Sequence, residues 1–149
     1  MSHSRIRCRL RRTTLSLAGA LAFAATTAHA AEIVLVTSAA NGIPALTAEE
    51  ASQLYLGRRT TLSDGTAVTL YDLPGGPARD RFYELLTGKN SNQIRAYWSR
   101  QVFTGRALPP REAKSADDLP TLLSNDGAAI GYLPDGQINP RLRVLLKLP

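Results

Sequence analysis

Residues 31–149 of this sequence lack the side chains that most often carry catalysis and metal binding. The chain of 149 residues has one cysteine, two histidines and one methionine, and all of them lie before position 31. Without a thiol or an imidazole, residues 31–149 can form no disulfide, no Cys-His or Ser-His-Asp catalytic group and no ordinary zinc, copper or haem site. We therefore expect a protein that is not an enzyme and that holds no metal or cofactor.

Residues 1–30 are predicted to be a signal peptide. Five arginines precede the short apolar run LSLAGALAFAA, and Ala28-His29-Ala30 matches an A-x-A cleavage site. The apolar run is too short to anchor the chain in a membrane. We expect export to the periplasm, cleavage after Ala30 and a single domain of residues 31–149. The general secretory route is favoured, although Arg11-Arg12 leaves twin-arginine export open.

The excess positive charge of the chain is concentrated in this leader. The full sequence has 18 lysines and arginines against 12 aspartates and glutamates, for a net charge of +6 at pH 7. Five of the basic residues belong to the leader, so residues 31–149 carry 13 basic against 12 acidic residues. A domain that is nearly neutral overall has no electrostatic basis for binding nucleic acid. We expect no nucleic-acid partner, and no transmembrane anchor once the leader is removed.

Strand patterns alternate with helix patterns along residues 31–149. The run EIVLVTS is almost wholly apolar, as in a strand buried on both faces, and Asp64-Gly65 predicts a hairpin turn. Thr47 and Glu50 have the spacing of a capping box at the start of a helix. The predicted strands cover 32–38, 66–71, 128–133 and 142–148, and the predicted helices cover 46–57, 77–87, 90–103 and 115–127. This order predicts an α/β fold with a helix-flanked mixed β-sheet.

Helical spacing also predicts which side chains two of these helices bury. In the helix at 77–87 the buried face is expected to consist of Ala78, Phe82, Leu85 and Leu86. In the helix at 90–103 the buried face is expected to consist of Ile94, Tyr97, Trp98 and Val102. Core packing is favoured over ligand stacking for the aromatic residues among them, because they recur at the spacing of one helix face.

The segment DLPGGPARDRF at 72–82 is the main candidate for a binding site. Gly76 is expected to be the N-cap and Pro77 the first residue of a helix that follows a strand. The backbone amides of the first turn are then free, and Arg79 adds a guanidinium that can bind an oxyanion. The same residues also suit an ordinary helix start with a solvated Arg79. On residue types alone this second interpretation is the more common one.

Four segments of the sequence resemble a known family. They are LYLGRRTTLSDGTAV, GGPARDRF, YWSRQVFTGRALPP and GAAIGYLP, and the resemblance extends over residues 46–134. Together they are similar to the second half of PstS-like phosphate-binding proteins of ABC transporters, which have the type II periplasmic-binding fold. In that family two lobes close on phosphate, and this chain resembles about one of them.

The resemblance also implies a binding segment. The family's Gly-Ser-Gly-Thr-Arg helix start corresponds here to Gly75, Gly76, Pro77, Ala78 and Arg79. Both hydroxyl side chains are missing, the proline removes a backbone donor, and only the arginine is retained. Asp72 stands where the family often has a basic residue, and its carboxylate is expected to repel phosphate. The predicted anion-binding residues are Gly75, Gly76, Ala78 and Arg79.

Two functions from different classes follow from these features. The first is a periplasmic solute-binding-like protein that binds phosphate or another oxyanion, or that assists phosphate transport. The alternative is a non-catalytic interaction module, in which the face left open by the missing lobe docks a transporter subunit, a membrane sensor or a second copy of the chain. The absence of a nucleophile and a base places an enzymatic function behind both.

Overall fold

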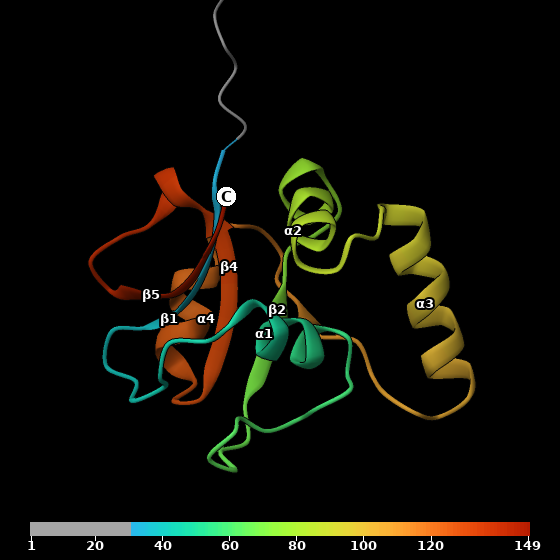
Figure 1. Ribbon diagram of the computed structural model, residues 1–149. Helices are drawn as coiled ribbons and strands as arrows, with labels where there is room; N and C mark the ends of the chain where they lie inside the picture. The colour runs from blue at the N-terminus through green and yellow to red at the C-terminus, as the bar shows by residue number, and fades with distance from the viewer. Residues whose placement is uncertain (1–30) are drawn as a thin grey trace, which may run out of the picture.

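The computed structural model describes residues 31–149, so the predicted signal peptide lies outside the described residues. These residues form one mixed sheet with helices around it (Figure 1). The strands are β1 (Ile33–Ser38), β2 (Thr69–Asp72), β3 (Arg111–Glu112), β4 (Ala129–Pro134) and β5 (Leu142–Leu148). The helices are α1 (Ala48–Tyr55), α2 (Pro77–Thr87), α3 (Ser91–Phe103), α4 (Leu119–Asn125) and the 3-10 turn η1 (Asp135–Gln137). Of the helices described, none has the length and apolar character that a membrane crossing requires.

The five strands lie in the order β3-β2-β4-β1-β5. β1 runs antiparallel to both of its neighbours, whereas β2 runs parallel to β4 and to β3. All six residues of β1 are buried, as its almost continuous apolar sequence predicted. The prediction of an α/β fold with a helix-flanked mixed sheet is therefore confirmed.

The helix starts follow local capping rules. Thr47 and Glu50 form the predicted capping box of α1, in which Thr47 Oγ1 accepts a hydrogen bond from the Glu50 amide at 3.2 Å. α2 covers the predicted residues with Gly76 as its N-cap, and Asn90 caps α3 by accepting a hydrogen bond from the Gln93 amide. The predicted starts of α1 and α2 are confirmed because each depends on residues only a few positions apart.

Two predicted boundaries differ from the structure, and one strand was not predicted. The turn at Asp64-Gly65 forms, but it closes only an isolated antiparallel bridge, and β2 begins later, at Thr69, because it pairs with β4 and β3 instead. α4 is shorter than predicted, because Ser115 and Asp118 bond each other in the turn before it, at 3.0 Å. Residues 104–114, which belong to no predicted strand or helix, contain β3, which pairs with β2 at the edge of the sheet.

α2 fully buries two of the four residues of its predicted face. Phe82 and Leu86 are buried, whereas Ala78 and Leu85 are only half-buried. Tyr83 is also buried, although the helical pattern did not include it. Tyr83 is buried because its hydroxyl finds a partner inside the protein, which its position on the helix does not reveal.

α3 buries less of its predicted face than α2 does. Ile94 and Trp98 are buried as predicted, and Tyr97 is half-buried. The prediction for Val102 is wrong, because its side chain is 48% exposed. α3 stands at the side of the molecule and packs mainly against α2, so its last turn extends past the core (Figure 1).

Gly57 allows the end of α1 to approach α3 closely. It has a φ of 65°, and a Cβ atom at this position would lie 2.8 Å from Ala107 Cβ and 3.0 Å from Trp98 Cη2. We expect Gly57→Ala to lower the free energy of unfolding by about 2–3 kcal/mol, because it adds left-handed strain and overpacking. The matched control is Gly105→Ala, since Gly105 has the same φ but nothing within 4 Å. Urea unfolding should show a loss of about 1 kcal/mol for the control, and equal losses would contradict the packing role.

Candidate functional site

The candidate site is built around the start of α2. Gly76 has a φ of 148°, a value that L-residues rarely adopt, and Pro77 is the first helical residue. The first backbone hydrogen bond of the helix runs from the Asp80 amide to the Gly76 carbonyl at 3.0 Å, and no side chain among residues 31–149 caps this end. The amides of Ala78 and Arg79 therefore remain available to a ligand.

The four residues predicted to bind an anion line one small hollow at this helix start. The hollow has a volume of about 200 Å³ and is formed by residues 73–79 together with Ala116. Its wall includes Gly75, Gly76, Ala78 and Arg79. The structure thus brings the predicted residues together around one space at the positive end of the α2 dipole.

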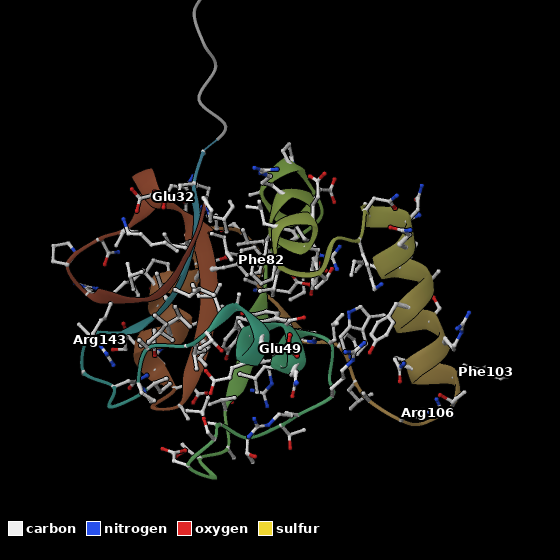
Figure 2. The ribbon with its side chains drawn as sticks, in the orientation of Figure 1. Glu32, Glu49, Phe82, Phe103, Arg106 and Arg143 are labelled. Carbon is white, nitrogen blue, oxygen red and sulfur yellow. The ribbon has the colours of Figure 1, made fainter. Side chains whose placement is uncertain are left out.

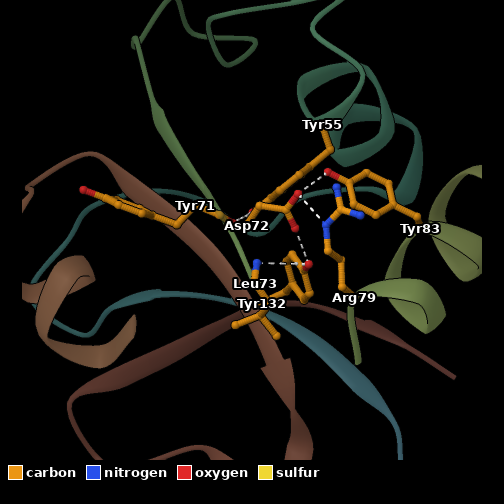
Figure 3. A network of polar contacts seen from close by, with 7 residues as sticks. All are labelled: Tyr55, Tyr71, Asp72, Leu73, Arg79, Tyr83 and Tyr132. Carbon is orange, nitrogen blue, oxygen red and sulfur yellow. Dashed lines mark hydrogen bonds and ion pairs between the residues drawn. The ribbon is translucent and has the colours of Figure 1, made fainter. Parts of the chain in front are cut away.

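A buried carboxylate, that of Asp72 at the end of β2, is bound to this helix start (Figure 3). Its Oδ2 accepts hydrogen bonds from Arg79 Nε at 3.0 Å and from the Tyr83 hydroxyl at 2.9 Å. Its Oδ1 accepts a hydrogen bond from the Tyr132 hydroxyl, which in turn accepts one from the Leu73 amide at 3.2 Å. With only 4% of its surface exposed, Asp72 joins β2, α2 and β4 through its side chain.

Burial and the charge of Asp72 determine the protonation states in this network. Burial first, and then the negative charge of Asp72, raise the pKa of Tyr83 and the pKa of Tyr132 far above the ordinary value of tyrosine. Burial lowers the pKa of Arg79, but the charge of Asp72, its hydrogen bond to Arg79 and the nearby Tyr83 and Tyr132 together outweigh burial and leave that pKa raised. At neutral pH both phenols are therefore neutral donors and Arg79 is a cation, which suits a carboxylate acceptor.

Arg79 is less free than its place in the sequence suggested. The ion pair with Asp72 occupies Nε, the guanidinium carbon lies 5.0 Å from the centroid of the Tyr83 ring, and the side chain is 20% exposed. Contrary to the sequence-based expectation, Asp72 does not present an uncompensated charge to an anion, because Arg79 neutralises it. The two terminal nitrogens of Arg79, which form no hydrogen bond with any of residues 31–149, remain as donors.

A larger cleft of about 800 Å³ adjoins Arg79, between the start of α2, α3 and residues 109–112. The charged and hydroxyl-bearing side chains that line it are Asp72, Arg79, Ser91, Arg95, Ser99 and Glu112. Arg95 was not predicted as a site residue. Ser91, Arg95 and Ser99 recur every four positions and so share one face of α3, which is a signal in the sequence. Only the packing of α3 against α2 shows that this face lines the cleft.

The chemistry of the site is hydrogen-bond donation. It offers backbone amides at the start of α2, the guanidinium groups of Arg79 and Arg95, and two serine hydroxyls. Within residues 31–149, no group of three or more histidine, cysteine, aspartate or glutamate side chains is placed to hold a metal ion. An arrangement of this kind can hold an anion through donors and positive charge.

The fold also occurs in solved structures of other proteins. No protein-family model and no curated protein sequence matches the chain. Its structure matches an ABC-type phosphate transport receptor from Vibrio cholerae with a TM-score of 0.60 and 17% sequence identity, over 77% of this chain and 46% of the receptor. The fold is that of about one lobe of such a receptor.

Two further structures share this phosphate-receptor fold. One, from Clostridium perfringens, is assigned as a phosphate ABC transporter substrate-binding protein and holds bound phosphate. It matches with a TM-score of 0.60 and 17% sequence identity, over 77% of this chain and 45% of that protein. The other, from Planctomyces limnophilus, is regarded as a phosphate-binding protein and matches with a TM-score of 0.57, 14% identity, and coverage of 77% and 41%. The chain thus spans less than half the length of these proteins. The likeness confirms the predicted resemblance in fold to about one lobe of the PstS-like family.

Proposed function

We propose that this protein is a periplasmic solute-binding-like protein that binds a small oxyanion, such as phosphate, at the start of α2. The proposal depends above all on one observation, the convergence of four residues on a hollow where backbone amides are unpaired: Gly75, Gly76, Ala78 and Arg79. The α2 dipole favours negative charge at this place. The phosphate-receptor fold, and the phosphate bound in the Clostridium perfringens protein, support this class of ligand.

In this proposal, donors from two helices hold the anion. The amides of Ala78 and Arg79 donate along the axis of α2, and the terminal nitrogens of Arg79 donate from the side. Arg95 of α3 lines the adjoining cleft with Arg79 and adds a second cation. The hydroxyls of the family's helix start are missing, and the carboxylate of Glu112 also lines the cleft. We therefore expect weaker binding than a site with the full set of donors provides.

The proposed role is binding without turnover, within phosphate transport or as an accessory to it. Residues 31–149 contain no histidine or cysteine, and the structural neighbours are transport receptors and binding proteins. The periplasmic location is inferred from the predicted signal peptide.

Isothermal titration calorimetry at low salt tests the anion site. Phosphate and sulfate are expected to bind the wild-type protein, and Arg95→Ala is expected to weaken binding about tenfold. The reason is that a hydrogen bond between a cation and an anion contributes about 1.5 kcal/mol. Arg79→Lys should also weaken binding, because lysine keeps the charge that pairs with Asp72 but loses the planar fork.

Arg141→Ala is the matched control for these variants. Arg141 is an exposed cation directly before β5, at the opposite edge of the sheet from β3, and it lines neither hollow. Its replacement should leave the affinity unchanged. The absence of heat with both anions at millimolar concentration contradicts the proposal. Equal losses for Arg95→Ala and Arg141→Ala also contradict it, because they indicate non-specific charge attraction.

A further inference from the structure

Exposed apolar side chains gather at the end of α3. The large hydrophobic residues that are exposed within residues 31–149 are Val102, Phe103 and Leu108, with 48%, 92% and 80% of their surfaces accessible. Figure 2 shows Phe103 at the last turn of α3, directed away from the body of the protein. Single exposed hydrophobic residues are common and need no explanation, whereas these three lie within seven positions of the chain.

Positive charge is concentrated in the same part of the chain. Residues 85–111 contain Lys89 and four arginines but no aspartate or glutamate, although residues 31–149 as a whole are nearly neutral. Arg95, Arg100 and Arg106 are exposed, and none of them forms a salt bridge with any residue from 31 to 149. A partner of this surface therefore meets apolar groups bordered by unpaired cations.

The surface is held in place before any partner arrives. The Tyr97 hydroxyl donates a hydrogen bond to the Leu56 carbonyl at 2.6 Å, which ties α3 to the end of α1. Ala107 packs against Gly57, so residues 106–110 form a ridge fixed to the protein. Pro109 and Pro110 of this ridge line both the cleft of about 800 Å³ and a second one of about 320 Å³. A preformed surface loses little conformational entropy on binding.

The end of α3 and this ridge are together called the α3–ridge surface. We infer that this surface docks a segment of a partner protein. In that segment, apolar side chains lie beside carboxylates. The two clefts beside the ridge receive the apolar side chains, against Val102 and Phe103 in one and Leu108 in the other. Arg100 and Arg106 attract the carboxylates, because they are exposed and have no acidic neighbour in this stretch of sequence. The inference does not depend on the anion site proposed at α2.

Two other occupants fit this surface less well. In a symmetric contact with a second copy, this surface faces the same surface of the other copy. Arg100 and Arg106 of one copy then repel Arg100 and Arg106 of the other. A lipid bilayer presents a flat anionic face, whereas the apolar residues here line two hollows. A protein segment can place its side chains into both hollows.

Selection from random peptides tests the chemistry of the partner without assuming its sequence. The purified protein is panned with displayed peptides of roughly twelve residues, and the selected sequences are expected to carry Asp or Glu beside Leu, Phe, Trp or Tyr. Synthetic copies are then measured by fluorescence polarisation. Binding should weaken by roughly tenfold or more in the double variants Arg100→Glu/Arg106→Glu and Phe103→Ser/Leu108→Ser. All four positions are exposed, so circular dichroism should show an unchanged fold.

Arg141→Glu is the control for a change in overall charge, and it should bind the peptides like the wild-type protein. The inference is overturned if no peptide is selected, if selected peptides lack acidic residues, or if both double variants bind like wild type. Dimerisation, or binding to vesicles that contain phosphatidylglycerol, also overturns it when Phe103→Ser/Leu108→Ser abolishes that association. The two sites share the cleft of about 800 Å³, so variants separate them: Phe103→Ser/Leu108→Ser should leave phosphate binding unchanged, whereas Arg95→Ala should weaken it, and failure of the α2 site and failure of this surface are therefore distinguishable.

Discussion

Asp72→Ala is expected to lower the free energy of unfolding by about 3–5 kcal/mol. The Asp72 carboxylate is the shared acceptor for Arg79, Tyr83 and Tyr132, and it is almost fully buried (Figure 3). Its removal leaves the half-buried Arg79 cation without a partner and two buried hydroxyls without an acceptor. Urea unfolding measures the loss, followed by circular dichroism and by the fluorescence of Trp98, the single tryptophan.

Two further variants distinguish the stability contributed by the Asp72 network from the effect of removing any polar group near α2. Asp80→Ala removes an exposed carboxylate from the first turn of the same helix, and it is expected to cost less than about 1 kcal/mol through the helix dipole. Tyr132→Phe removes one donor but keeps Arg79 paired, and it is expected to cost about 1–2 kcal/mol. If Asp72→Ala costs no more than Asp80→Ala, the network does not stabilise the fold.

The same network limits what Arg79 can give to a ligand. Its charge is balanced by Asp72, and its Nε is already bonded, so an anion competes with an internal carboxylate for this side chain. Arg95 forms no salt bridge with any described residue and is exposed beside the same cleft. The geometry therefore makes Arg95 the freer cation, although the sequence pointed to Arg79.

Above about pH 10 the protein is expected to lose stability steeply. Burial, as the main cause, raises the pKa of Tyr55, Tyr83 and Tyr132 above the ordinary tyrosine value. The unfolded chain therefore releases these protons near pH 10, whereas the folded chain keeps them. Because the unfolded state then binds fewer protons, the free energy of unfolding falls by about 1.4 kcal/mol per pH unit for each tyrosine, or about 4 kcal/mol for all three. Below pH 10 both states are protonated, and these groups add no pH dependence.

Urea unfolding at several pH values between about 9 and 11 measures this slope. The double variant Tyr83→Phe/Tyr132→Phe should reduce the slope to about one third, whatever it does to stability at neutral pH, because only Tyr55 then remains of the three. Tyrosinate absorbance of the folded protein should show no ionisation of Tyr55, Tyr83 or Tyr132 in this pH range. Ionisation of all five tyrosines near pH 10 in the folded state contradicts the prediction.

The sequence by itself determined most of the helices and strands and the class of the fold. The capping box at Thr47 and the Gly76-Pro77 helix start were predicted because each involves residues within one helical turn. The buried strand β1 was predicted because its apolar run is continuous. The four quoted segments indicated the phosphate-receptor fold, which the structural matches confirmed for about one lobe.

The tertiary structure alone decided which side chains meet and which stay exposed. Asp72 bonds Tyr132, which lies 60 positions away on β4, and this contact turned a residue expected to repel anions into the centre of a buried network. Because α3 packs against the side of α2, Arg95 lines the cleft of the candidate site and Val102 is exposed. The physical reason is that capping and periodicity act over a few residues, whereas contacts between elements depend on how those elements pack, which no local pattern encodes.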